Sequence, residues 1–226
     1  KKQVIVQSLP YSPLFSKKVS KSKSINSIET WADLLNYFLT IIEEVYKKKE
    51  ANMIAFKEVW ALEMANPLLN LYGDRIKIIS VIREPADIFA SSKMNAGNYP
   101  LLFLARHWRK TIAISSYLKN KFPNNIFELD YETLCLNPNH TYKKLIDFLG
   151  LDNNNLKNIP SPIDDYGNLF LKNSSYDGFK SKIIDPKSIG KYNDTLNKAE
   201  KEWIFYLTSN LDRNRFKSLI KDKKKF

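Results

Sequence analysis

Residues 76–92 read IKIISVIREPADIFASS, and this stretch contains a complete transition from strand to helix. Its first seven residues form a nearly continuous apolar run, which is typical of a strand that is covered on both faces in a parallel sheet. Pro85 then favours the start of a helix, because proline is preferred at the first helical position, and we expect the helix to reach about Met94. Arg83 lies between the two elements.

Arg83 is suited to binding a phosphate. Ligands of open α/β sheets bind beyond the carboxyl ends of the strands, and a helix N-terminus favours an anion there. A guanidinium group can hold a phosphate with two parallel hydrogen bonds. Ser91 follows about two helical turns later, where its hydroxyl can reach the same anion. The alternative is a salt bridge from Arg83 to Asp87, with Ser91 as a helix-surface serine; the spacing alone is compatible with both.

The rest of the chain alternates short apolar runs with longer amphipathic ones, which indicates an α/β fold with a parallel sheet. Further strands are expected at 3–8, 53–57 and 125–129, and helices at 30–46, 60–71, 101–119, 138–149 and 198–211. We therefore predict one three-layer domain over residues 1–226, with a central parallel sheet flanked by helices. Residues 151–196 are expected to be mostly irregular, and residues 213–226 to form a basic tail.

The net charge of +12 comes from the two ends of the chain. Residues 1–23 contain six lysines and no acidic residue, and residues 213–226 contain seven basic residues and one aspartate. The body between them carries equal numbers of basic and acidic residues. A nucleic-acid-binding domain normally carries a basic stripe along its folded face, so the pattern argues against a nucleic-acid partner. The lysines at 17–23 are placed to serve an anionic ligand.

The remaining composition excludes several further classes of protein. One cysteine and two histidines argue against a disulfide framework and against a Cys/His-rich metal site, so no metal is expected. No apolar run approaches the length of a transmembrane helix, and residues 1–11 are too short and mixed for a signal peptide. We expect a soluble protein and favour the cytoplasm.

Three blocks resemble the PAPS-dependent sulfotransferases, which use 3′-phosphoadenosine 5′-phosphosulfate (PAPS) and have a P-loop-like α/β fold. Residues 76–92 are similar to the family's 3′-phosphate-binding segment, which implies that Arg83 and Ser91 hold that phosphate. Residues 126–151, IFELDYETLCLNPNHTYKKLIDFLGL, resemble a second family block in which Tyr131 lies near the adenine. Residues 188–200, SIGKYNDTLNKAE, resemble the segment that closes over the nucleotide, which implies that Lys191 is a second 3′-phosphate contact and that Gly190 also belongs to the cofactor-binding residues.

The strand before these blocks also fits the family. Residues 55–60, AFKEVW, place Lys57 where related enzymes have a lysine that helps to stabilise the transferring sulfuryl group. Its alternative is a strand-end lysine that reaches solvent. Glu58 is a candidate general base for the acceptor hydroxyl, and it is equally compatible with a simple ion pair to Lys57.

The first strand departs from the family pattern. The resemblance predicts a loop that reads Pro-Arg/Lys-Ser-Gly-Thr-Thr, whereas this chain has LPYSPL at 9–14. Ser12 is kept as a candidate cofactor contact, but Tyr11 replaces the basic residue and Pro13 the glycine. Proline has no N–H to donate and lacks the conformational freedom of glycine.

Three explanations for this departure stay open. The loop has degenerated and the protein is weak or inactive; Lys17 or Lys18 replaces the missing cation; or a segment is missing between Ser12 and Trp31. We favour the third as a hypothesis.

The sequence thus predicts a sulfotransferase that moves a sulfuryl group from PAPS to an acceptor hydroxyl or amine. The acceptor itself is open, and glycans, small alcohols and peptides are all compatible with the resemblance. The alternative is a catalytically inactive, sulfotransferase-like binding protein. A P-loop kinase is excluded because the first glycine of the chain is Gly73, so no Gly-x-x-x-x-Gly-Lys motif can follow the first strand.

Overall fold

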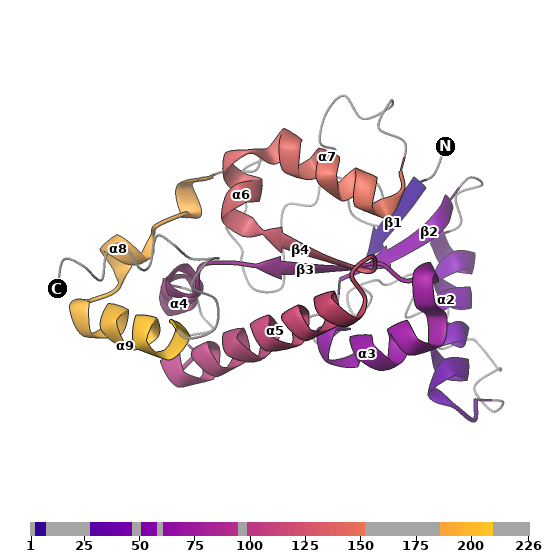
Figure 1. Ribbon diagram of the computed structural model, residues 1–226, viewed down its shortest axis with the longest axis horizontal. Helices are drawn as coiled ribbons and strands as arrows, with labels where there is room; N and C mark the ends of the chain where they lie inside the picture. The colour runs from indigo at the N-terminus through magenta and orange to yellow at the C-terminus, as the bar shows by residue number, and fades with distance from the viewer. Residues whose placement is uncertain are drawn as a thin grey trace. The chain divides into compact units, whose positions relative to one another are not determined.

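The structure, a computed structural model, describes residues 3–7, 28–46, 51–57, 61–94, 99–151 and 186–209 (Figure 1). It divides into two compact units. Among the described elements, the first unit contains β1, α2 and β2, and the second contains those from α3 to α9. The prediction of one domain over 1–226 stays a prediction.

The first unit is a β–α–β arrangement. Strand β1 (Gln3–Gln7) pairs in parallel with β2 (Ala51–Phe56), and α2 (Trp31–Tyr46) lies between them in the chain and buries Ile41 and Ile42. Thr30 caps α2: its Oγ1 accepts the Asp33 N–H at 3.1 Å, and Asp33 Oδ2 accepts the Thr30 N–H at 2.9 Å. This reciprocal pair satisfies two N–H groups at the start of the helix.

The second unit is built on another parallel pair, β3 (Ile78–Ile82) and β4 (Ile126–Asp130). Helices α4 (Pro85–Met94) and α5 (Leu101–Lys121) connect the two strands, as a parallel crossover requires. The register places Ile82 opposite Asp130, so both strands end at the same edge. The α/β class predicted from the alternating pattern is confirmed.

Helices lie on both faces of this strand pair (Figure 1). On one face, α3 (Ala61–Tyr72) and α5 share a buried cluster with β4, made of Ala65, Leu69, Leu118 and Ile126. On the other face, α7 (Pro138–Leu149) packs on β4 through Phe127 and Phe148, whose ring centroids are 5.2 Å apart. The helix α7 ends at Gly150 in a left-handed conformation, as predicted.

The prediction that the first-quoted strand is covered on both faces is wrong for β3. Ser80 and Ile82 are buried toward α5, whereas Ile79 and Val81 are 39% and 55% exposed. The reason is that α7 packs over β4 through Phe127 rather than over β3. The apolar run therefore predicted the position of the strand correctly, but it wrongly predicted that both faces of the strand are buried.

Two of the short elements that were not predicted adjoin the strands β3 and β4. Helix α6 (Tyr131–Leu136) follows β4 at once, because Asp130 accepts the Thr133 N–H at 2.7 Å and caps it. The 3₁₀ helix η3 (Gly73–Arg75) leads from α3 toward β3. Both lie in stretches too short for a periodic pattern.

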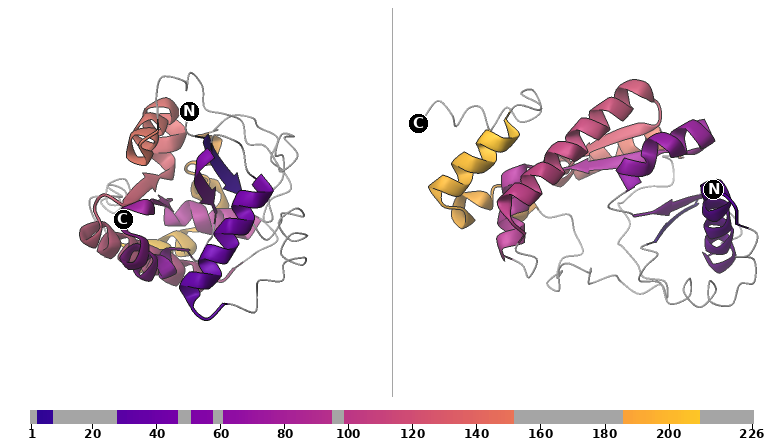
Figure 2. Two further views of the ribbon diagram at one scale, coloured as in Figure 1. Left: turned by 90° about the vertical axis from the view of Figure 1, so that its right-hand side faces the viewer. Right: turned by 90° about the horizontal axis from the view of Figure 1, so that it is seen from below.

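The last described elements pack on α4 and α6. They are the 3₁₀ helix η5 (Pro186–Ser188), α8 (Tyr192–Thr195) and α9 (Lys198–Thr208). Helices α8 and α9 contact α4, and α9 also contacts α5 (Figure 2). The shared core contains Ala86, Phe89, Ala90, Ala105, Leu196 and Ile204. Of the predicted irregular segment 151–196, most lies outside the described residues.

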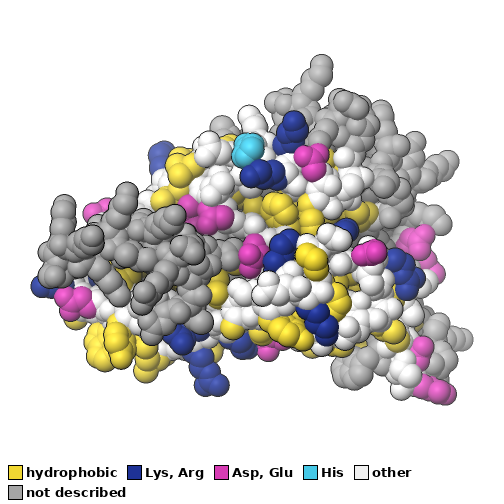
Figure 3. Space-filling model, in the orientation of Figure 1, with side chains coloured by type: hydrophobic (Ala, Val, Ile, Leu, Met, Phe, Trp, Pro, Cys, Tyr) yellow, Lys and Arg dark blue, Asp and Glu magenta, His cyan; other side chains and the backbone are white. Residues whose placement is uncertain are grey.

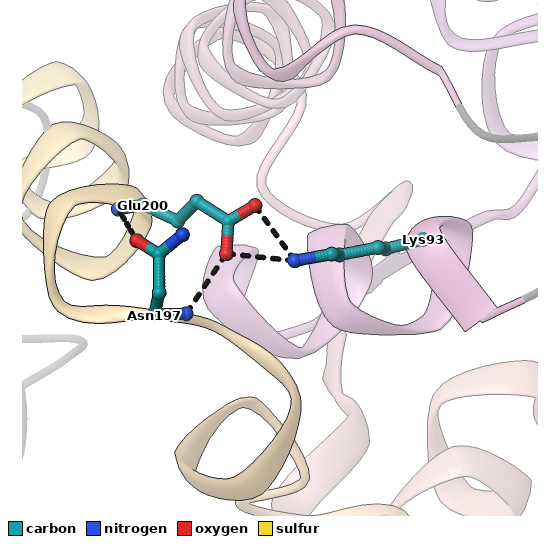
Figure 4. A network of polar contacts seen from close by, with 3 residues as sticks. All are labelled: Lys93, Asn197 and Glu200. Atoms are coloured by element: carbon teal, nitrogen blue, oxygen red, sulfur yellow. Dashed lines mark hydrogen bonds and ion pairs between the residues drawn. The ribbon is translucent and has the colours of Figure 1, made fainter.

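Polar contacts fix the start of α9 (Figure 4). Asn197 Oδ1 accepts the Glu200 N–H at 3.0 Å, and Glu200 Oε2 accepts the Asn197 N–H at 2.8 Å, which is a capping box. The same Glu200 carboxylate pairs with Lys93 of α4 at 2.8 Å. These contacts join the C-terminal elements to α4.

On the face seen in Figure 3, Lys and Arg side chains are interspersed with Asp and Glu over the described residues. That face shows no continuous basic stripe in the described part of the chain. No helix in the described ranges combines the length and apolar character that a membrane span requires.

Candidate functional site

The site begins where β3 and β4 end together. Arg83 is the first residue after β3 and Tyr131 the first after β4, and the register of the strands makes them neighbours. Arg83 Cζ lies 4.5 Å from the centroid of the Tyr131 ring. The contact is close enough for a cation–π interaction, so the tyrosine ring orients the guanidinium group.

Two further hydrogen bonds hold Arg83 in place, and a third joins Tyr131 to Ser188. Trp108 of α5 donates from Nε1 to the Arg83 carbonyl oxygen at 3.0 Å. Arg83 donates from Nη2 to the Ser188 carbonyl oxygen at 3.1 Å, and the Tyr131 and Ser188 hydroxyls lie 2.6 Å apart. The side chain that sequence reasoning selected is therefore fixed by residues from three other elements.

Arg83 nevertheless keeps unused hydrogen-bonding capacity. Its Nε is buried and has no hydrogen-bond partner among the residues that the structure describes. Buried polar groups are nearly always paired in folded proteins, and an unpaired one needs an explanation. A bound anion would supply the missing acceptor, because a guanidinium group readily binds phosphate oxygens with two N–H groups.

Asp87 does not form the salt bridge that was the alternative for Arg83. The carboxylate is 1% exposed, and its oxygens accept the N–H groups of Gly190 and Tyr192 at 2.8 and 3.0 Å. In the described structure no ion pair joins Arg83 to Asp87. Asp87 instead holds the turn at 190–192 beside the arginine.

Two glutamates lie at the same edge. Glu84 donates its backbone N–H to Glu132 Oε1 at 2.9 Å, and its own Oε1 accepts the Ala86 N–H at 3.3 Å. Burial raises the pKa of Glu84 to about 8, and the negative charges of Glu132, Asp87 and Asp130 add to the effect. Burial also raises the pKa of Glu132. Glu84 is therefore mainly neutral at pH 7, which limits the negative charge beside Arg83.

The structure brings together some of the predicted site residues. Arg83 and Tyr131 are joined through hydrogen bonds to Ser188, and Gly190, two residues after Ser188, donates its N–H to Asp87 of α4. Lys191 follows Gly190 and is exposed, and Ser91 lies partly buried on α4, one turn after Asp87.

The other predicted residues belong to the N-terminal part of the chain. Lys57 follows β2 in the first compact unit and is exposed. Ser12 and Glu58 lie outside the described residues. The donor loop and the candidate base therefore stay predictions.

Sequence reasoning did not identify four residues that build this site. Ser188, Glu84, Glu132 and Asp87 all contact the Arg83 cluster or its neighbouring turn. Their positions gave a partial signal, since Glu84 and Asp87 flank Pro85 and Ser188 precedes Gly190 by two residues. Their roles depend on contacts about 50 to 105 residues apart in the chain, which no local pattern contains.

In the described ranges, no group of three or more His, Cys, Asp and Glu side chains is arranged to hold a metal ion.

Three known structures share the fold of this chain. The sulfotransferase domain of the Synechococcus PCC 7002 olefin synthase matches with a TM-score of 0.57 at 14% identity, over 92% of this chain and 94% of that one. A sulfotransferase domain from the curacin biosynthetic pathway matches with a TM-score of 0.51 at 14% identity, over 92% and 81%. The mouse sulfotransferase SULT7A1, in complex with PAP, matches with a TM-score of 0.51 at 13% identity, over 99% and 88%. At such identities the likeness shows the fold.

The family follows from the sequence itself. A sequence model described as "Sulfotransferase family" matches residues 12–155, which is more than half of the chain. The chain therefore belongs to the sulfotransferase family. No curated protein matches it.

Proposed function

We propose that this protein transfers a sulfuryl group from PAPS to a hydroxyl or amine of an acceptor. The observation that carries the proposal is the held guanidinium of Arg83, which lies at the carboxyl ends of two parallel strands with a buried, unpartnered Nε. Ligands of such sheets bind at this edge. The PAP complex of the mouse relative supports a nucleotide of this kind as the ligand.

Each site residue has a proposed role in binding the nucleotide. Arg83 and Lys191 supply positive charge to the 3′-phosphate, and Ser91 and the Gly190 backbone supply further contacts. The Tyr131 ring lies near the adenine. Ser12 contributes to binding the 5′-phosphosulfate. The proposal places the phosphate at the start of α4, where the helix dipole also favours an anion.

The transfer itself is an in-line displacement. The acceptor oxygen or nitrogen forms a bond to sulfur while the bond from sulfur to the bridging oxygen breaks, and that electron pair leaves with PAP. Lys57 stabilises the charge on the transferring group, and Glu58 takes the acceptor proton. Positioning and fixed charge supply most of the catalysis in the analogous phosphoryl transfer.

A second candidate is a binding protein that has lost transfer activity. The observation that favours it is the sequence at 9–14, where Tyr11 and Pro13 replace the basic residue and the glycine of the family loop. A loop without that glycine and that cation binds a phosphosulfate poorly.

Thermal unfolding with added nucleotide separates the candidates. A ligand at about 100 times its Kd adds roughly 2.7 kcal/mol to the free energy of unfolding, which raises Tm by several degrees in a chain of this size. The enzyme is expected to be stabilised by PAP and not by ATP. A protein that has lost its donor site would respond to neither. Screening glycans, small alcohols and peptides with labelled PAPS then tests transfer and identifies the acceptor.

A further inference from the structure

Asp87 links two parts of the site that are distant in sequence. It lies in the first turn of α4, four residues after Arg83, and its two oxygens accept the N–H groups of Gly190 and Tyr192. We propose that Asp87 is a positioning residue, which holds the turn carrying Lys191 against Arg83 and so sets the affinity for a 3′-phosphate. This inference rests on the proposed function.

The carboxylate is well suited to this role. It is 1% exposed, so its hydrogen bonds are shielded from water, and bonds to a charged acceptor are stronger than neutral ones. Its position in the first turn of α4 also stabilises its negative charge through the helix dipole. Removing the carboxylate would leave two backbone N–H groups without their acceptor, which costs more than the bonds themselves are worth.

The turn at 188–192 is shaped to meet this carboxylate. Gly190 has φ +76°, a conformation that favours glycine, and its N–H and that of Tyr192 converge on Asp87. Lys191 lies between these two anchored residues and is exposed. Its backbone is therefore fixed on both sides while its ammonium group stays available to a ligand.

Arg83 anchors the same turn from the other direction. It donates to the Ser188 carbonyl oxygen at 3.1 Å, two residues before Gly190. The two candidate cations, Arg83 and Lys191, thus belong to elements that Asp87 and Ser188 join. A change at Asp87 is expected to move one cation relative to the other without removing either.

Asp87→Asn tests the inference with little change in shape. An amide keeps one acceptor oxygen but presents an NH₂ group to the second backbone N–H. Calorimetry of the full chain would give Kd for PAP and for 5′-AMP, which lacks the 3′-phosphate. We expect the variant to bind PAP about tenfold more weakly or worse, while its affinity for 5′-AMP changes less than about twofold.

Two further variants serve as a control and as an independent test. Ser115→Ala removes another buried hydrogen bond of the same unit, from Ser115 Oγ to Glu128 at 2.7 Å, and should leave both affinities unchanged. Gly190→Ala strains the turn while the Asp87 carboxylate stays intact, and should reproduce the selective loss of PAP affinity. If Asp87→Asn fails to fold, Gly190→Ala still tests whether the position of this turn sets the affinity for PAP.

A double-mutant cycle with Lys191→Ala tests whether Asp87 affects PAP binding through Lys191. If Asp87 acts by placing Lys191, the loss caused by Asp87→Asn is smaller when Lys191 is already absent. Unchanged PAP affinity in Asp87→Asn, or an equal loss for PAP and 5′-AMP, would overturn the positioning role. A wild-type chain that binds no PAP at all would instead overturn the proposed function, and the inference with it.

Discussion

The guanidinium carbon of Arg83 lies 4.5 Å from the centroid of the Tyr131 ring, at the common end of β3 and β4. The tyrosine hydroxyl lies 2.6 Å from Ser188 Oγ, and Arg83 donates to the carbonyl oxygen of the same serine. Tyr131 therefore supports the arginine in two separable ways, through its ring and through its hydroxyl.

Substitutions at Tyr131 separate these two contributions. Tyr131→Phe keeps the ring under Arg83 and loses the hydroxyl that contacts Ser188, so PAP affinity should fall by about threefold to tenfold, as for one neutral hydrogen bond. Tyr131→Leu removes the aromatic ring as well, so its affinity for PAP should be lower still, by roughly another threefold. Calorimetry measures both, and equal affinities of the two variants would show that the ring does not support Arg83.

Glu84 makes stability depend on pH. Its pKa is about 8 in the folded chain and near 4.5 when exposed, so the folded state holds this proton more tightly than the unfolded state. The stabilisation is complete below about pH 4.5, declines as the pH rises toward 8, and is absent above it. Glu84→Gln removes the contribution of this one group, so the variant should gain stability relative to wild type as pH rises, by up to about 5 kcal/mol.

Urea unfolding at intervals between pH 5 and 9 measures this difference. Glu132 contributes in the same direction, because burial raises its pKa too, so some dependence should persist in Glu84→Gln. A wild-type-to-variant difference that stays constant over the whole range would contradict a buried, protonated Glu84.

Lys57 should affect transfer and leave nucleotide binding intact. Lys57→Ala is expected to lower kcat about a hundredfold, because a cation at the transferring group acts mainly in the transition state, while PAP affinity stays within about twofold. Lys77→Ala is a matched control, since Lys77 precedes β3, at the end of the strand opposite to Arg83, and donates to the Asn124 carbonyl oxygen. Equal transfer rates for wild type and Lys57→Ala, measured with an acceptor that the enzyme sulfates, would show that Lys57 is a solvent-exposed lysine without a role in transfer.

The contacts at the start of α9 rank two substitutions by their effect on stability (Figure 4). Asn197→Ala removes the cap that accepts the Glu200 N–H and should cost about 1 kcal/mol. Lys93→Met removes only a partly exposed ion pair and should cost about 0.5 kcal/mol or less. Urea unfolding compares them, and a larger loss in Lys93→Met would reverse the ranking.

Local patterns predicted the elements around the site well. The apolar run before Arg83, Pro85 at the start of α4 and the end of α7 at Gly150 each depend on a few neighbouring residues. Such features are set by periodicity and by cap chemistry, which a sequence displays directly. Arg83 followed from the same patterns, whereas Tyr131 was selected through the resemblance to the family.

Long-range contacts explain what the sequence did not predict. Asp87 was considered as a salt-bridge partner of Arg83, yet its carboxylate accepts N–H groups more than 100 residues away. The exposure of Val81 depends on α7 packing over the neighbouring strand. Neither follows from local pattern, because both depend on which elements meet after folding.

The central claim is that Arg83 binds the 3′-phosphate of a PAPS-type nucleotide. Calorimetric titration of the full chain with PAP, beside Arg83→Ala and the control Lys77→Ala, tests it most directly. We expect one site in wild type and in the control, and affinity at least about tenfold weaker in Arg83→Ala, as for loss of a charged hydrogen-bonding group. Equal binding of PAP by wild type and Arg83→Ala would contradict the account.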